Sequence, residues 1–155
     1  MAFDGRGSLL LTGGGDSMAR LWRFPDGEKT SEFAHETNWV RAVALDSSGT
    51  RIALGCGPGV IYVHDIVGGQ DVAELHGHGG RVLMIGFTTD PDVLVSAAAD
   101  GTIRSWSLSG QKQLAEVRID ASLQAAALDA SNGIVLAASA GGTMAIRLPT
   151  VRTTE

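Results

Sequence analysis

Three residues, Trp22, His64 and Trp106, stand 42 residues apart, and each closes a short apolar run. Arg147 follows 41 residues after Trp106. A fixed interval of about forty residues is typical of repeat proteins, in which each unit is a small supersecondary structure whose apolar faces are covered by its neighbours. The period therefore predicts a stacked array of similar units.

Shifting the chain against itself by 42 residues places apolar positions on apolar positions, such as Phe3 on Leu45 and Phe87. A fourth copy aligns with the third at a shift of 41 or 42 residues, so its register differs from the period by one residue. The 155 residues thus hold about 3.7 units of this length in a single array. We place the units at approximately 1–33, 34–75, 76–117 and 118–155.

The third unit contains four short runs separated by turn-forming residues. The runs are Arg81–Phe87, Val93–Ala98, Thr102–Ser107 and Lys112–Val117. Runs of this length, broken at short intervals by Asp-Gly and Ser-Gly, are typical of strands joined by hairpins. The sequence therefore predicts an all-β fold of four antiparallel strands in each unit.

Composition and charge exclude several classes of protein. The net charge is −5, from 12 Lys and Arg against 17 Asp and Glu, so the chain repels polyanions and nucleic acid is not expected as a partner. No apolar stretch approaches the length of a membrane-spanning helix, so we expect no membrane. The single cysteine, Cys56, cannot form an internal disulfide, which fits a reducing compartment such as the cytoplasm.

Motifs in the first and third units resemble those of a known repeat family. The third unit carries Gly77-His78, Ser96, Asp100-Gly101 and Trp106-Ser107, and the first carries Thr12, Asp16 and Trp22. This pattern resembles the WD repeat family, whose units contain a Gly-His pair, a turn aspartate and a terminal Trp-Asp. The resemblance implies a β-propeller with four-stranded blades, here an open arc or a part of a larger ring.

The second and fourth units depart from that pattern. Pro58 and Gly141 occupy the position of the turn aspartate, and Leu54 and Ala137 occupy that of the serine or threonine. We therefore interpret both as degenerate copies.

The resemblance implies that the matching polar residues form a structural hydrogen-bond network within a blade. In it the aspartate accepts a hydrogen bond from the histidine, the histidine pairs with the strand hydroxyl, and the indole completes the chain. The expected members are His78, Ser96, Asp100, Trp106, Thr12, Asp16 and Trp22. The alternative is a Ser-His-Asp catalytic triad, but Val95-Ser96-Ala97 offers no strained nucleophile turn.

Three further motifs have structural explanations. His76 and His78 are too few for a metal site, since zinc takes three or four protein ligands. Cys56 lies in a predicted middle strand, where a thiol behaves as a small apolar group. The glycines at 13–15 lack the Gly-Lys-Ser/Thr ending of a phosphate-binding loop. We expect no catalytic residue, metal or cofactor.

The resemblance implies a contact face made by the loop that precedes the first strand of each unit and by the turn between the second and third strands. Trp39 is the only tryptophan outside the repeated position, and Arg41 lies on the same side of the strand. Arg81 is the equivalent of Trp39 one unit later. These residues, with His35 and Asn38, are the candidate partner contacts, since tryptophan and arginine are enriched in binding hot spots. The alternative is that Trp39 packs on neighbouring turns.

The function predicted from the resemblance is a non-catalytic scaffold for a protein or peptide partner, as a segment of a larger regulatory propeller protein. An enzyme that uses the central channel and a nucleic-acid-binding propeller are the alternatives. An unclosed array exposes apolar faces and strand edges at both ends. We therefore expect a longer propeller, association of two copies into a ring, or a small open arc.

Overall fold

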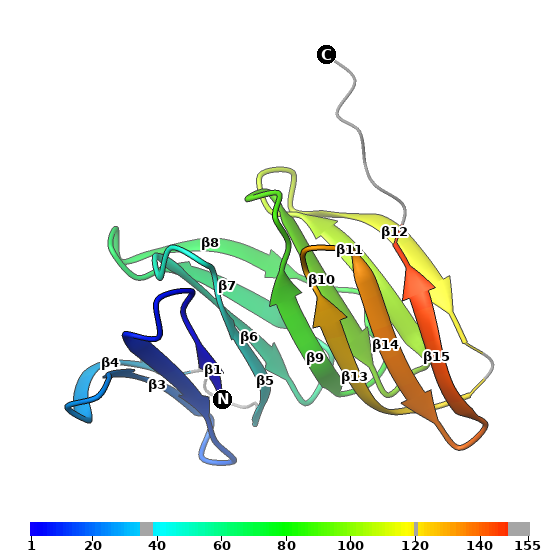
Figure 1. Cartoon of the computed structure of the whole chain (residues 1–155), viewed down its shortest axis with the longest axis horizontal. Helices are drawn as coiled ribbons and strands as arrows, with labels where there is room; N and C mark the ends of the chain where they lie inside the picture. Colours follow the sequence, from blue (N-terminus) through cyan, green and yellow to red (C-terminus); the bar gives the residue numbers. More distant parts are fainter. Residues whose placement is uncertain (35–38, 120, 149–155) are drawn as a thin grey trace.

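The computed structural model describes residues 1–34, 39–119 and 121–148, and this part of the chain contains strands and no helix. It therefore has no helix that is long and apolar enough to cross a membrane. The strands form four antiparallel sheets, each made of strands that are consecutive in the chain (Figure 1). The predicted all-β fold is confirmed.

The first sheet comprises β1 (Ala2–Phe3), β2 (Leu9–Gly13), β3 (Met18–Arg23) and β4 (Glu28–Ala34). The second comprises β5 (Val40–Leu45), β6 (Arg51–Cys56), β7 (Ile61–Asp65) and β8 (Gln70–Leu75). The third comprises β9 (Val82–Phe87), β10 (Val93–Ala98), β11 (Thr102–Ser107) and β12 (Lys112–Arg118). The fourth comprises β13 (Leu123–Asp129), β14 (Ile134–Ser139) and β15 (Gly142–Arg147).

The strands of the third sheet lie where the turn residues place them. β10 and β11 have the predicted bounds, while β9 begins one residue later and β12 ends one residue later than expected. Asp100-Gly101 makes the tight connection between β10 and β11, with Gly101 at a φ of 82°, a backbone conformation that glycine adopts without a steric penalty. Local turn chemistry therefore sets the strand bounds.

The first strands of the four sheets lie next to one another in series. β1 contacts β5, β5 contacts β9, and β9 contacts β13. In Figure 1 the sheets follow one another in an open arc around these strands, from β1–β4 at one end to β13–β15 at the other. This is the arrangement of propeller blades, with the first strand of each blade on the inside.

The apolar core lies between the sheets, in three separate layers. The layer between the second and third sheets contains Ala42, Ala44, Ala53, Ile61, Val63, Ala73, Leu75, Val82, Ile85, Phe87, Leu94, Trp106 and Leu108. β10 and β11 are buried along almost their whole length because sheets cover both of their faces. β13 alternates between covered and exposed residues because a sheet packs on one of its faces. Stability therefore depends on contacts between neighbouring sheets.

Candidate functional site

A hollow of about 480 Å³ opens where the loops of the second and third sheets meet. It is formed by the loops before β5 and β9 and by the β6–β7 and β10–β11 turns. Its lining residues are Trp39, Arg41, Gly57, Gly79, Gly80, Arg81, Ala99 and Asp100. Three of the predicted contact residues, Trp39, Arg41 and Arg81, are thus brought together, while His35 and Asn38 lie outside the described residues.

Trp39 presents its ring at this surface. Its exposed fraction is 56%, so neighbouring turns leave more than half of the side chain accessible. The guanidinium carbon of Arg41 lies 4.6 Å from the centre of the Trp39 ring, which is within the range of a cation–π contact. The alternation of side chains along the strand places both residues on one side, as the sequence suggested.

The hollow is positively charged at its rim. Arg41 and Arg81 are both exposed, and neither forms an ion pair with any residue in the described part of the chain. The acidic residue in the lining is Asp100, whose carboxylate accepts hydrogen bonds from Thr102 and from the backbone N–H of Gly79. The rim therefore offers two guanidinium groups and an aromatic face to a partner.

A buried hydrogen-bond chain adjoins the hollow at Asp100. The indole N–H of Trp106 donates to the hydroxyl of Ser96 at 2.8 Å, and Ser96 lies 2.7 Å from Nε2 of His78. Nδ1 of His78 lies 2.8 Å from the hydroxyl of Thr102, which donates to Asp100 at 2.7 Å. Five side chains from β10, β11 and the loops before β9 and β11 are thus connected.

The direction of each hydrogen bond in this chain follows from its two ends. Because the Thr102 hydroxyl donates to the Asp100 carboxylate, its oxygen accepts the proton of His78 Nδ1. Nε2 of a neutral His78 is then an acceptor, and the Ser96 hydroxyl donates to it while accepting from Trp106. The network therefore requires the neutral imidazole with its proton on Nδ1.

Burial favours the same protonation state. Burial lowers the pKa of His78 to about 4, although the nearby Asp100 carboxylate opposes the shift. Burial opposes ionisation of Asp100, but hydrogen bonds from Thr102 and Gly79 outweigh it and hold the pKa of that carboxyl below its ordinary value. At neutral pH the site therefore pairs a neutral histidine with an ionised aspartate.

The geometry corrects one detail of the expected network. The sequence predicted a direct bond from the histidine to the aspartate, but Oδ2 of Asp100 is 3.6 Å from Nδ1 of His78 and Thr102 links the two. The signal that could have found Thr102 is its position two residues after Asp100, where a hydroxyl can bond back to the turn carboxylate.

The first sheet contains only a part of this network. Trp22 donates its indole N–H to Thr12 at 2.9 Å, as Trp106 does to Ser96. Asp16 does not join them: it forms an ion pair with Arg20 at 2.8 Å and accepts the backbone N–H of Met18. Among the described residues, no imidazole forms a hydrogen bond with Thr12 or Asp16.

The network and the hollow share Asp100. Its Oδ2 atom accepts the N–H of Gly79 at 2.7 Å, which fixes the Gly79–Gly80–Arg81 segment against the β10–β11 turn. Gly80 also sits close to the Asp100 backbone, where a Cβ atom would lie 3.1 Å from the Asp100 nitrogen. The buried chain therefore positions the loop that carries Arg81.

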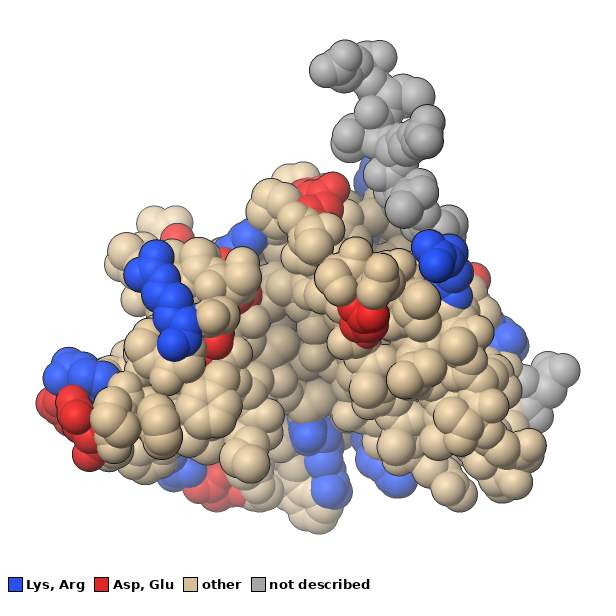
Figure 2. Space-filling model, in the orientation of Figure 1, with Lys and Arg blue, Asp and Glu red and all other residues tan. Residues whose placement is uncertain are grey.

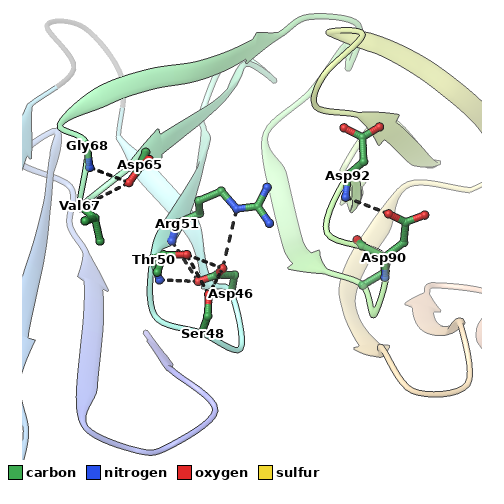
Figure 3. Close-up of polar contacts among 10 residues, drawn as sticks. Asp46, Ser48, Thr50, Arg51, Asp65, Val67, Gly68, Asp90 and Asp92 are labelled. Carbon is green, nitrogen blue, oxygen red and sulfur yellow. Dashed lines mark hydrogen bonds and ion pairs between the residues drawn. The ribbon is translucent and has the colours of Figure 1, made fainter.

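A second set of aspartates, which was not predicted from the sequence, closes turns at the opposite ends of the first strands. Asp46 accepts the backbone N–H groups of Thr50 and Arg51 and the hydroxyls of Ser48 and Thr50 (Figure 3). Asp4 accepts equivalent bonds from Ser8 and Leu9. Asp4 and Asp46 are 42 residues apart, so the same period contained the signal.

Figure 3 shows Arg51 extending from the Asp46 turn toward the hairpin that carries Asp90 and Asp92. Its guanidinium carbon lies 5.6 Å from the centre of the Phe87 ring in the third sheet. Arg51 thus bridges the second and third sheets on the side opposite the hollow, and its role is structural.

The remaining candidates lie apart from the hollow. Cys56 is fully buried, and burial raises its pKa to about 11, so the thiol is protonated at neutral pH. His76 pairs with Glu74 at 3.0 Å on the surface. Within 1–34, 39–119 and 121–148 no three His, Cys, Asp or Glu side chains are placed to hold a metal ion.

The four sheets are arrayed around their first strands, and the Trp–Ser–His–Thr–Asp chain braces the third of them. This arrangement defines a set of propeller blades. The family model described as "WD domain, G-beta repeat" matches residues 1–23 and 69–107, the parts that contain Trp22 and Trp106. The chain therefore belongs to the WD-repeat family, as a partial array of about four repeats.

Curated proteins with similar sequences are much longer than this chain. WD repeat and HMG-box DNA-binding protein 1 of Xenopus laevis is 30% identical over 110 residues, which cover 71% of this chain and 10% of that protein. Protein ROOT INITIATION DEFECTIVE 3 of Arabidopsis thaliana is 33% identical over 87 residues, 56% of this chain and 19% of that protein. The U3 small nucleolar RNA-associated protein 21 homolog of Schizosaccharomyces pombe is 30% identical over 105 residues, which cover 68% of this chain and 12% of that protein.

The chain thus spans about a tenth of the length of the first of these relatives. WD-repeat proteins generally act as protein-interaction scaffolds, and their fold is generally non-enzymatic. The coarse functional class follows from the family, while the partner does not.

Proposed function

We propose that this chain is a non-catalytic platform that binds a protein or peptide partner at the hollow of Trp39, Arg41 and Arg81. The observation that carries the proposal is the exposed Trp39 ring with the Arg41 guanidinium stacked on it. Large aromatic and arginine side chains dominate binding energy at protein interfaces, and a pre-stacked pair loses little side-chain entropy on binding.

The charge of the rim indicates the chemistry of the partner. Arg41 and Arg81 lack an acidic partner among the described residues, so an incoming carboxylate can pair with a guanidinium without displacing an existing ion pair. The Trp39 face suits an apolar or planar group next to that carboxylate. A segment with an acidic residue beside an apolar one is therefore the favoured ligand.

Two observations argue against catalysis at this site. The His78 side chain is fully buried and held in the hydrogen-bond chain, so it has no access to a substrate. The inner strands β5, β9 and β13 carry few acids or bases; they read VRAVAL, VLMIGF and LQAAALD. A channel enzyme needs convergent titratable groups, and these strands do not supply them.

Nucleic acid is the competing partner class, because the printed names of some relatives include DNA-binding and RNA-associated. The net charge of −5 argues against it in this chain. Figure 2 shows small groups of Lys and Arg mixed with Asp and Glu over a largely uncharged face, with no continuous basic track. Retention on DNA or RNA columns that falls steeply with salt would instead support nucleic acid.

We propose that the chain binds its protein partner in the cytoplasm, where a reducing environment suits the buried thiol of Cys56. The nucleolar wording in the name of one relative makes the nucleus the competing compartment. Fractionation of the native cell, followed by immunoblotting of the chain, distinguishes the two.

Affinity capture tests the proposal. The intact chain is compared with Trp39→Ala/Arg41→Ala, and bound proteins are quantified by mass spectrometry. The matched control is Val67→Ala/Arg118→Ala, which also removes an exposed apolar side chain and an exposed arginine but lies away from the hollow. We expect the first pair to lose the captured partner by at least tenfold and the control to retain it.

The melting midpoint separates binding from packing. Because Trp39 is 56% exposed, its replacement by alanine should shift stability by roughly 0.5 kcal/mol or less, as is usual at surface positions. Equal capture by both double variants, or unfolding of Trp39→Ala, would show that the hollow is not the contact site and that Trp39 packs instead.

A further inference from the structure

Each end of the sheet array presents one face that no other sheet in the described part of the chain covers. On the first sheet, Phe3 and Phe24 are each 48% exposed and contact each other edge to face at 5.4 Å. On the fourth sheet, Leu136 is 50% exposed and stands among exposed alanines of β13 and β15. Exposed apolar faces of this kind mark association surfaces.

The face of the first sheet is a second copy of a face that is buried inside the array. The third sheet contributes to its interface with the second sheet the residues Phe87, Leu94, Ser96, Trp106 and Leu108. The residues 84 positions earlier, which is two periods, are Phe3, Leu10, Thr12, Trp22 and Phe24. Each pair is similar in size or polarity, so the first sheet carries a similar set of side chains, and no sheet in the described part of the chain packs against it.

The face of the fourth sheet matches the opposite side of that interface. In the second sheet Ala44 pairs with Ala53, which pairs with Val63, and Ala42 pairs with Gly55, which pairs with Ile61. The same register in the fourth sheet joins Ala127, Leu136 and Ala145 in one row and Ala125, Ala138 and Thr143 in the other. The third sheet covers the rows of the second sheet, whereas most residues in the corresponding rows of the fourth sheet are exposed.

The two uncovered faces are complementary in size. At the internal interface, large side chains such as Trp106 and Phe87 pack on small ones such as Ala42, Ala44 and Ala53. The first sheet likewise presents large aromatic residues, and the fourth presents mainly alanines. If the first-sheet face met its own copy, large side chains would oppose large ones, and if the fourth-sheet face met its own copy, small side chains would oppose small ones. Both arrangements pack poorly.

We propose that the first sheet of one copy docks on the fourth sheet of a second copy, and that the reciprocal contact closes a ring of two chains. The inference is independent of the partner hollow. A contact between two different faces closes only if its rotation completes a ring. Two chains of four sheets give eight blades, within the typical range of about 4 to 8 for closed propellers. The open arc in Figure 1 leaves both faces free for this contact.

The mass in solution tests the ring. We expect size-exclusion chromatography with light scattering to give about 32 kDa, since one chain has a mass of 16.1 kDa. Phe24→Lys and Leu136→Glu each place a charge on one face, at positions that are already about half exposed in a single chain. Each variant alone should lose the dimer and elute as a monomer.

Mixing the two variants separates the proposed contact from other modes of association. Each variant retains one native face, so an equimolar mixture should regain a 1:1 dimer through the intact first-sheet and fourth-sheet faces, which also shows that both variants are folded. Val67→Lys is the matched control, because Val67 is 78% exposed in the β7–β8 turn and belongs to neither face. The control should keep the mass of the parent chain.

Three results would overturn the proposal. A monomeric parent chain would mean that the faces are covered by other partners, such as further blades of a longer protein. A dimer that survives in either single variant would mean that one face pairs with its own copy. A ladder of higher oligomers would mean that the head-to-tail contact does not close on two chains.

Discussion

Acidification should destabilise this protein through His78 before its carboxylates protonate. The folded imidazole has a pKa of about 4 because of burial, whereas an unfolded histidine titrates near its ordinary value of 6.5. Between these values the unfolded chain binds more protons than the folded chain, so the stability falls as the pH falls through this window. Above pH 6.5 the contribution is fully present, and below about pH 4 both states are protonated.

The difference between the folded and unfolded pKa of His78 determines how much stability is lost on acidification. A difference of one pKa unit corresponds to about 1.4 kcal/mol, so protonation of His78 should cost about 3 kcal/mol in total and about 2 kcal/mol by pH 5. At pH 5 the carboxyls with lowered pKa values, such as Asp100, stay ionised in the folded state. The interval from pH 7.5 to 5 therefore separates the loss at His78 from protonation of these carboxyls.

Urea unfolding followed by tryptophan fluorescence measures this loss across the interval, at one protein concentration so that any association contributes equally. His78→Asn removes the titrating group and should flatten the dependence, although the variant is less stable at pH 7.5. His76→Asn is the matched control, because it removes an exposed histidine outside the hydrogen-bond chain, and the pH dependence attributed to His78 should persist in it. The reasoning fails if His78→Asn keeps the parent slope, or if NMR titration places the pKa of His78 near 6.5.

Three further predictions concern buried groups. Ser96→Ala should cost more stability than Thr12→Ala in urea unfolding, because it leaves two buried partners unpaired at roughly 1–3 kcal/mol each, whereas Thr12 is only partly buried; equal losses would contradict the network. Cys56 should not react with a thiol reagent until the chain unfolds, since its thiol is fully buried with a pKa of about 11, and rapid labelling of the native protein would refute this. Gly59→Ala should lower the melting midpoint more than Gly69→Ala: both glycines have positive φ, but only at Gly59 would a Cβ atom clash with a backbone oxygen, that of His78. Similar midpoints would show that the loop yields.

The sequence alone determined the strands, because strand formation in this chain depends on local features. Alternating apolar residues and the turn residues Asp100-Gly101 define β10 and β11 without reference to the rest of the fold. The 42-residue period then implied similar sheets that cover one another. The same period relates the Asp4 and Asp46 turns, but neither aspartate belongs to the apolar positions or to the motif that indicated the repeat.

The packing of the sheets determines how residues at equivalent repeat positions differ. Trp106 and Trp22 occupy the same repeat position, but Trp106 is 1% exposed between two sheets while Trp22 lies on an uncovered face. His64, in the same position of the second sheet, instead pairs with Asp71 at 2.5 Å and stacks on Phe33. Local sequence selects a strand, whereas burial and hydrogen-bond partners depend on which sheet packs against it, and that neighbour is distant in the chain.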